Sequence, residues 1–313
     1  MGDSINLTDN YAYWVRFAAV ASTSVALLLV IIKLYAWLVT DSSAMLASTT
    51  DSMLDLFASL MNVIILKFAL APADEEHKFG HGKAESLAGL IQAAFVLGSA
   101  SLLLFHGVDR IIKPQPIVQS EVGIWVTILA IVLTLALVIF QRYVIKKTGS
   151  VVISADALHY QSDLLLNLGV LVAIILSQGY WLQADGVFTI LVGLFLMFGA
   201  GKIIWVSVHH LMDHELSEQE LLQITEIILK HDQALGLHEL RTRQAGQHRF
   251  IQFHLELDDS LSLLEAHSIG EGIEEQIIQA FSPCEVFIHH DPTSVVKTEL
   301  VVKTELVDNE MVS

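Results

Sequence analysis

The feature that most constrains this chain is the segment of residues 44–68, which is apolar and long enough to cross a membrane but carries Asp51 and Asp55 near its middle. As a helix it exceeds the roughly 30 Å of a hydrocarbon core, so both carboxylates are predicted to lie close to the bilayer centre. Spaced four residues apart, they share one helix face. Each charge at that depth opposes insertion by roughly 2.5 to 3.5 kcal/mol. Protons, a cation, or both in turn must therefore compensate them.

A second apolar segment, residues 152–177, carries His159 and Asp163 at the same four-residue spacing. Three carboxylates and one imidazole on two helices form a ligand set that Zn²⁺ or Fe²⁺ accepts. The alternative is that each pair only forms hydrogen bonds between helices. Small residues such as Ser and Gly pack helices at a lower cost than charged ones, so the pattern favours a metal site.

The composition is that of a membrane protein with a soluble extension, because the mean hydropathy is +0.57 and 53% of the residues are hydrophobic. The net charge of −17 is unevenly distributed. Residues 1–208 hold 11 basic and 14 acidic side chains, whereas residues 209–313 hold 6 and 20. An acidic C-terminal part argues against nucleic-acid binding, which requires a basic face, and it suits cations.

The single cysteine, Cys284, excludes disulfides within the chain and thiolate-rich zinc motifs. Metal sites must therefore be built from histidine and carboxylate. The first residues are acidic rather than basic, and the small residues 18–22 lie inside the first apolar segment. We therefore expect no cleaved signal peptide.

Six segments are long and apolar enough to predict a bundle of six transmembrane helices. They cover residues 13–40, 44–70, 85–112, 121–145, 152–177 and 183–208. Lysine and arginine are concentrated around the second and fourth connections and at the end of the last helix, so the positive-inside rule predicts cytoplasmic termini. The prediction thus gives a cytoplasmic N-terminus, residues 1–12, and a transmembrane domain, residues 13–208.

The second connection contains Asp74, His77 and His81 beside glycines that let it fold back on itself. These three side chains are competent metal ligands, and they predict a loop site. A solvated loop explains the same charges without any metal. The sequence does not decide between the two interpretations.

Residues 209–292 predict a small cytoplasmic α+β domain with the order helix, strand, strand, helix, strand. The expected elements are residues 217–231, 237–244, 250–257, 262–281 and 285–289. Ser217 and Glu220 form the pattern of a capping box at the first helix. Residues 293–313 contain Val-Val-Lys-Thr-Glu-Leu twice in succession, and we predict a flexible tail there.

Histidines are concentrated in this domain, where they predict a cluster of divalent ions. The candidate ligands are His238, His254, His267, His289 and Asp291. His289 and Asp291 share a strand face at a spacing of two, and Asp291 has two oxygens with which to bridge two ions. The alternative is a scatter of surface histidines. We assign that alternative to His106, His209, His210, His214, His231, His248 and His290.

Together these motifs resemble the cation diffusion facilitator family, and most closely its bacterial zinc and ferrous-iron efflux pumps. The resemblance covers residues 10–292. It rests on Asp51-x-x-x-Asp55, His159-x-x-x-Asp163, the loop Phe79-Gly80-His81-Gly82-Lys83-Ala84-Glu85 and the run His289-His290-Asp291-Pro292. It implies a homodimer in the bacterial inner membrane, with a metallochaperone-like cytoplasmic domain.

The resemblance also implies three metal sites in each protomer. These are a transport site at Asp51, Asp55, His159 and Asp163, a loop site at Asp74, His77 and His81, and a cytoplasmic binuclear site at His238, His254, His267, His289 and Asp291. Family members tuned to manganese usually carry Asp where His159 stands. The resemblance therefore favours Zn²⁺, with Cd²⁺ and Fe²⁺ as further substrates.

The predicted function is export of divalent cations across the lipid bilayer in exchange for protons. Histidine titrates in the physiological range, and the chain has no glycine-rich motif for binding ATP phosphates. An intramembrane hydrolase is disfavoured because Tyr160 and Gln161 follow His159, so the His-Glu-x-x-His motif is missing. A membrane-anchored metal sensor without transport leaves the intramembrane carboxylates unexplained.

Overall fold

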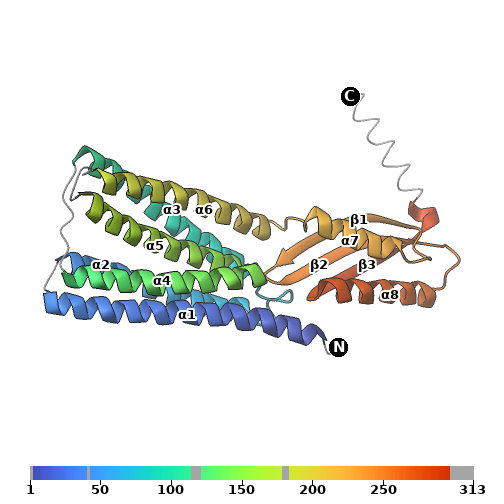
Figure 1. Cartoon of the computed structure of the whole chain (residues 1–313). Helices are drawn as coiled ribbons and strands as arrows, with labels where there is room; N and C mark the ends of the chain where they lie inside the picture. Colours follow the sequence, from blue (N-terminus) through green and yellow to red (C-terminus); the bar gives the residue numbers. More distant parts are fainter. Residues whose placement is uncertain (1–2, 41–42, 114–120, 178–182, 297–313) are drawn as a thin grey trace, which may run out of the picture. The chain divides into compact units, whose positions relative to one another are not determined.

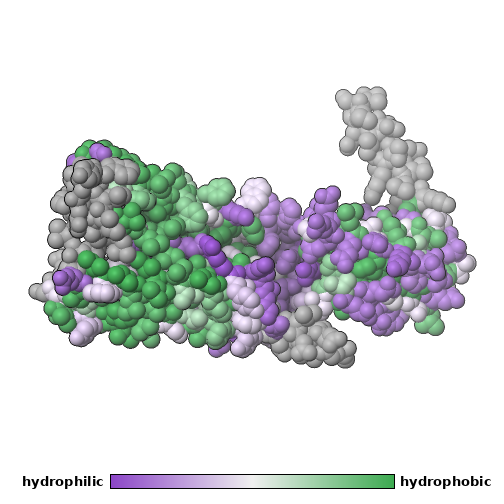
Figure 2. Space-filling view, viewed as in Figure 1, coloured by the Kyte–Doolittle hydropathy of each residue, from purple (hydrophilic) through white to green (hydrophobic). Residues whose placement is uncertain are grey.

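The computed structural model describes residues 3–40, 43–113, 121–177 and 183–296 (Figure 1). The chain divides into two compact units, and each is described by itself. One is the membrane unit, Asp9–Leu211, and the other, the C-terminal unit, begins at Met212. On the face that Figure 2 shows, hydrophobic residues predominate on the membrane unit and hydrophilic residues on the C-terminal unit. Of the predicted tail, residues 297–313 lie outside the described residues.

The membrane unit consists of six long helices that run lengthwise beside one another (Figure 1). They are α1 (Asp3–Thr40), α2 (Ser43–Ala69), α3 (Lys83–Ile112), α4 (Glu121–Thr148), α5 (Val151–Ser177) and α6 (Ala184–Leu211). In the part of the chain that the structure describes, all of them except α5 are long and apolar enough to cross a membrane. The predicted membrane bundle is confirmed. Helix α1 begins earlier than the apolar segment because residues 3–12 contain no Gly or Pro to end it.

The outer surface of this bundle is apolar. Phe105, Trp125 and Phe198 on three different helices are 76%, 71% and 79% exposed. Exposed apolar side chains in such numbers favour association in water, but they match the acyl chains of a bilayer. The surface therefore agrees with the membrane location that hydropathy predicts.

Helices α3 and α6 pack closely because glycines lie at their contact. A Cβ atom added to Gly107 would lie 2.6 Å from Ile190 Cγ1, and one added to Gly186 would lie 2.7 Å from the carbonyl oxygen of Gly107. Such distances are shorter than any stable contact. Glycine is therefore required at both positions for the backbones to approach.

A buried carboxylate joins α5 to the four helices that precede it. Asp156 is only 3% exposed. Its Oδ2 atom accepts hydrogen bonds from Ser22 Oγ of α1 and Gln141 Nε2 of α4, each at 2.7 Å. Its Oδ1 atom accepts from Asn62 Nδ2 of α2 at 3.1 Å and from Gln92 Nε2 of α3 at 3.2 Å. Asp156 is thus a hydrogen-bonded hub of five helices.

The C-terminal unit has the predicted order of helices and strands. Its elements are α7 (Glu218–Leu229), β1 (Gly236–Ala245), β2 (His248–Leu257), α8 (Leu263–Phe281) and β3 (Cys284–Pro292). The strands form one sheet in the order β1-β2-β3, with β1 antiparallel and β3 parallel to β2. Strand β3 is longer than residues 285–289, because pairing with β2 continues as far as Leu257 and Pro292. The predicted end of this strand was wrong.

Both helices of this unit cover the same face of the sheet. The core contains Ile224 of α7, Ile273 of α8, and Ile251 and Phe253 of β2, each fully buried. Residues of β2 alternate between the two faces, so His254 lies on the face opposite the helices. Each helix begins with a capping box, formed by Ser217 with Glu220 at α7, as predicted, and by Ser262 with Glu265 at α8.

Replacement of Asp156 should destabilise the membrane unit. In the Asp156→Ala variant four donors from four helices lose their acceptor. At an average of about 0.6 kcal/mol for a hydrogen bond between membrane helices, the free energy of unfolding should fall by about 2 to 3 kcal/mol. Unfolding of the purified protein in detergent measures this change.

The control is Asp109→Ala, which removes an exposed carboxylate of α3 that pairs with Lys113 at 3.5 Å. Equal stabilities of the two variants would contradict the role assigned to Asp156.

Candidate metal sites

Three of the four predicted transport ligands form a cluster inside the membrane unit. Asp55 of α2 and Asp163 of α5 lie on either side of His159, whose Nε2 atom is 2.8 Å from Asp55 Oδ1 and 3.8 Å from Asp163 Oδ2. One ligand atom from each residue lies within 4.8 Å of the other two. The side chains are only 20% to 31% exposed. We call these three residues the membrane cluster.

Asp51, the fourth predicted ligand, lies one turn of α2 from Asp55 but is not part of the membrane cluster. Its side chain is exposed. Its charge and that of Asp55 act on each other across this turn. The spacing of four residues gives Asp51 and Asp55 the same face of α2.

The loop between α2 and α3 brings its three predicted ligands together. Asp74 Oδ1 lies 3.2 Å from His77 Nδ1, and Asp74 Oδ2 lies 3.3 Å from His81 Nε2. Gly80 has a φ of +76° at the point where the chain turns back, which favours glycine. We call Asp74, His77 and His81 the loop cluster. The sequence prediction that the loop folds back is confirmed.

Two features of the loop cluster suit a cation. The backbone N–H of His77 lowers the pKa of the Asp74 carboxyl, aided by the N–H of Glu76, so the ionised form is favoured. His81 is 7% exposed, and its Nδ1 atom is buried with no hydrogen-bond partner among the described residues. The ring therefore presents Nε2, the atom that faces Asp74, as the available ligand.

The C-terminal unit places histidines in a row across the open face of its sheet. His238 of β1 is the cross-strand partner of His254, and His254 is the partner of His289 of β3. Directly paired residues project from the same face. The ring centroids are 5.0 Å apart for His238 and His254 and 4.5 Å apart for His254 and His289.

Asp291 joins the three histidines of this row. Its Oδ2 atom lies 2.7 Å from His254 Nδ1 and 3.3 Å from His238 Nε2, and its Oδ1 atom lies 3.1 Å from His289 Nε2. Each carboxylate oxygen thus faces a different part of the row. This geometry suits a carboxylate that bridges two ions. We call His238, His254 and Asp291, whose ligand atoms lie within 4.8 Å of one another, the sheet cluster.

The two remaining predicted ligands of the C-terminal unit are more open. His289 is 66% exposed and contacts the sheet cluster through Asp291 and the ring of His254. His267 lies on an exposed part of α8 and is not part of the cluster.

An irregularity in β1 lies beside the sheet cluster. The register between β1 and β2 shifts between His238 and Arg241, and Glu239 has a φ of +49°. Glu239 Oε2 lies 3.9 Å from His254 Nε2, and Glu256 Oε1 lies 3.2 Å from His238 Nδ1. A bulge with a strained residue next to a cluster of ligands is a common device for aiming side chains.

His290 is not the surface residue expected from the sequence. It pairs with Leu255, on the helix-covered face, and in the part of the chain that the structure describes its buried Nε2 atom has no hydrogen-bond partner. A Cβ on Gly270 of α8 would lie 2.3 Å from this atom. Burial lowers the pKa of His290, so the neutral ring is favoured there.

Three further charged groups of the membrane unit lie outside the predicted sites. Besides the Asp156 hub, these are Glu85, which accepts a hydrogen bond from Tyr11 at 2.7 Å, and Lys33 of α1. A charged residue inside an apolar segment is by itself a sign of function. That sign was present for Asp156 and Lys33.

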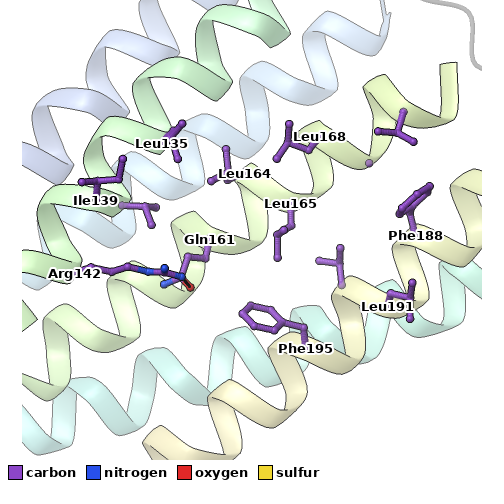
Figure 3. Close-up of a pocket in the computed structure, with 14 residues that line it drawn as sticks. Leu135, Ile139, Arg142, Gln161, Leu164, Leu165, Leu168, Phe188, Leu191 and Phe195 are labelled. Carbon is purple, nitrogen blue, oxygen red and sulfur yellow. Dashed lines mark hydrogen bonds between the residues drawn. The ribbon is translucent and has the colours of Figure 1, made fainter. Parts of the chain in front are cut away.

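A cavity of about 570 Å³ lies between α4, α5 and α6. Figure 3 shows Leu135, Leu164, Leu168 and Phe195 along it, with Arg142 and Gln161 joined at one end by a 2.9 Å hydrogen bond. Its lining has no carboxylate or imidazole. The cavity therefore suits hydrocarbon rather than a metal ion.

Two family models match the chain. The cation efflux transmembrane domain matches residues 19–212, and the cytoplasmic domain of cation efflux proteins matches residues 202–293. Among solved structures, the zinc form of the putative zinc transporter CzrB is 31% identical and covers 26% of this chain and 94% of its own, with a TM-score of 0.25.

Curated relatives match over nearly the whole length. The cation-efflux pump FieF of Shewanella oneidensis is 48% identical over 291 residues, which is 93% of this chain and 98% of that protein. The cation-efflux pump FieF of Yersinia pestis is 44% identical over 300 residues, 96% of this chain and 100% of that protein. The chain therefore belongs to the cation efflux family, the cation diffusion facilitators, and is a metal-cation transporter of the membrane rather than an enzyme.

Proposed function

We propose that this transporter exports Zn²⁺ from the cytoplasm in exchange for protons, and that the membrane cluster is the site of exchange. The observation that carries the proposal is that Asp55, His159 and Asp163 meet within 4.8 Å inside an apolar bundle. Among the described residues Ser162 is the neutral side chain that donates to these carboxylates, whereas four such side chains donate to Asp156. A divalent cation and protons are the two ligands that alternate at such a site.

The exchange follows from the chemistry of the ligands. A metal ion binds only to the deprotonated imidazole and carboxylates, so its arrival releases protons. An imidazole has an ordinary pKa near 6.5, which places this competition in the physiological range. Exposure of the cluster to the opposite side lets protons displace the ion there. No residue needs to form a covalent bond, and the proton gradient supplies the energy.

Zinc is the substrate that the ligand types favour. Zn²⁺ accepts imidazole and carboxylate together in a tetrahedral site, and Asp51 supplies the fourth ligand when its side chain turns toward Asp55. Cd²⁺ and Fe²⁺ accept the same ligands and are proposed as further substrates. Hard ions such as Mg²⁺ prefer oxygen ligands alone, so His159 disfavours them.

The other two clusters are proposed to deliver and sense the metal. The loop cluster, at the end of α2 nearer the cytoplasm, holds an ion weakly because Asp74 and His77 are about half exposed. The sheet cluster with His267 and His289 is proposed as the binuclear cytoplasmic site. Cations there lower the net charge of −14 on residues 209–313 and so reduce repulsion between two copies of the domain.

We further propose that the protein is a homodimer in the inner membrane of a bacterium, with both termini in the cytoplasm. The match to the cytoplasmic domain of cation efflux proteins supports the pairing, and the bacterial relatives support the location. Residues 1–12, 13–208, 209–292 and 293–313 are proposed as N-terminus, transmembrane domain, cytoplasmic domain and tail.

Zinc flux into proteoliposomes tests the proposed exchange. The native chain should transport zinc faster when a pH gradient is imposed, and Asp55→Ala should reduce this flux by at least about tenfold, because a ligand is lost. Asp51→Ala should cause a similar loss if Asp51 completes the site. The matched control is Asp109→Ala, which removes an exposed carboxylate of the same unit.

Flux through the native chain that is indifferent to the pH gradient would exclude proton exchange. Zinc binding to the native chain without any flux would instead support a metal sensor.

Loss of the sheet cluster should lower the number of zinc ions that each full-length chain binds. In the variant with both His254→Ala and Asp291→Ala, the row loses its central imidazole and its bridging carboxylate. Equilibrium dialysis with zinc measures the bound ions, and His214→Ala, which removes an exposed histidine outside the row, is the control. An unchanged number of bound ions in the double variant would rule out a metal site on the sheet.

A further inference from the structure

Lys33 is a charged side chain inside an apolar membrane helix. It lies within the span Asn10–Thr40 of α1, seven residues or about 10 Å of helix from the end of the span. A lysine at such depth opposes insertion unless it is paired or snorkels to the surface. The contacts of Lys33 show which of these applies.

The ammonium group of Lys33 is held against α2. Its Nζ atom donates to Ser52 Oγ at 2.7 Å and to the carbonyl oxygen of Ser48 at 3.4 Å. Ser52 is 1% exposed and directly follows Asp51. The side chain is therefore anchored inside the bundle, next to the turn of α2 that carries the proposed ligands, and does not reach for the surface.

The charge of Lys33 acts on all three carboxylates of the proposed transport site. Asp163, Asp55 and Asp51 are the acidic groups whose charges act on it. The first of these belongs to α5, and the other two belong to α2. Lys33 thus lies in the electrostatic field of the whole site, although it has no lone pair with which to bind a metal ion.

We infer that Lys33 is a fixed countercharge that matches the site to one divalent cation. This inference rests on the proposed transport site. Three ionised aspartates and one ammonium carry a net charge of −2, which one divalent ion neutralises while His159 stays neutral. A monovalent ion leaves the site negative, and a trivalent ion leaves it positive. In a medium of low dielectric constant, such residual charge is costly.

The countercharge also limits how tightly the ion is held. The ammonium repels a divalent ion at the site, so it weakens binding without removing any ligand. A transport site must bind its ion strongly enough for entry and weakly enough for release. Lys33 is therefore a specificity-determining residue that acts through charge and not through coordination.

Zinc binding to the purified full-length chain tests the inference. The loop cluster and the sheet cluster are first disabled by His77→Ala, His254→Ala and Asp291→Ala, so that calorimetry reports the transport site. In this background Lys33→Met, which keeps a side chain of similar length, should bind zinc about tenfold more tightly. Lys33→Arg keeps the charge and should bind with nearly the background affinity.

The control is Lys146→Met, which removes an exposed lysine of α4 and should leave affinity unchanged. Lys33→Gln replaces Lys33→Met if the latter does not fold, with the same expectation. Unchanged or weaker binding by the uncharged variants would overturn the inference. Weaker binding is the result expected if Lys33 only supports the fold, since its loss then disorders the ligands.

Transport separates this inference from the function on which it rests. In proteoliposomes Lys33→Met should lower both KM and kcat for zinc, because the ion binds more tightly and leaves more slowly. A higher KM would contradict the countercharge even if the native chain exchanges zinc for protons. Zinc binding at equilibrium requires no pH gradient. The binding measurement therefore tests the countercharge even if zinc is not exchanged for protons. If Asp55→Ala leaves binding unchanged in the same background, the proposed site itself is wrong.

Discussion

Every charge placed in hydrocarbon needs compensation, and the way each charge is compensated decides its role in this protein. Helix α5 carries two carboxylates within eight residues, and their charges are compensated in different ways. Asp156 accepts four hydrogen bonds from four other helices and is sealed from solvent. Asp163 and its partner Asp55 share one imidazole and remain partly accessible. The first carboxylate is saturated and holds the bundle together, whereas the second pair is the one proposed to bind a cation.

The buried hub at Asp156 lies beside the proposed transport ligands on the same helix. His159 lies one turn after Asp156 on the same helix, so the hub fixes the rotation and depth of the turn that presents the ligands. Neutral donors are enough to stabilise the Asp156 carboxylate, because a carboxylate that accepts several hydrogen bonds needs no cation. The proposed exchange site needs the opposite arrangement, with too few donors for its charge.

Much of the architecture follows from patterns within short stretches of the sequence. Apolar runs predicted the helices of the membrane unit to within a few residues, apart from the polar start of α1. Apolar and polar alternation predicted the strand that carries His254. The ligands of the loop cluster were predicted because they lie within eight residues of one another. In each of these cases local spacing determines which side chains share a face.

Relations between distant segments were beyond such reasoning. The alignment of His238, His254 and His289 depends on the register of three strands, which the sequence does not display. The end of β3 was misjudged because Asp291 and Pro292 are typical of turns, yet pairing with β2 continues through them. The hub at Asp156 could not be predicted from local patterns, since its four donors come from 15 to 134 residues away.

The most direct test of the account is the number of protons released when zinc binds to the membrane cluster. Calorimetry in buffers of different ionisation enthalpy measures it on the full-length chain, with the loop and sheet clusters disabled as above. The account predicts a net release of protons near neutral pH that disappears with Asp55→Ala, because metal and protons compete for the same groups. Zinc binding at this cluster without proton release would contradict it.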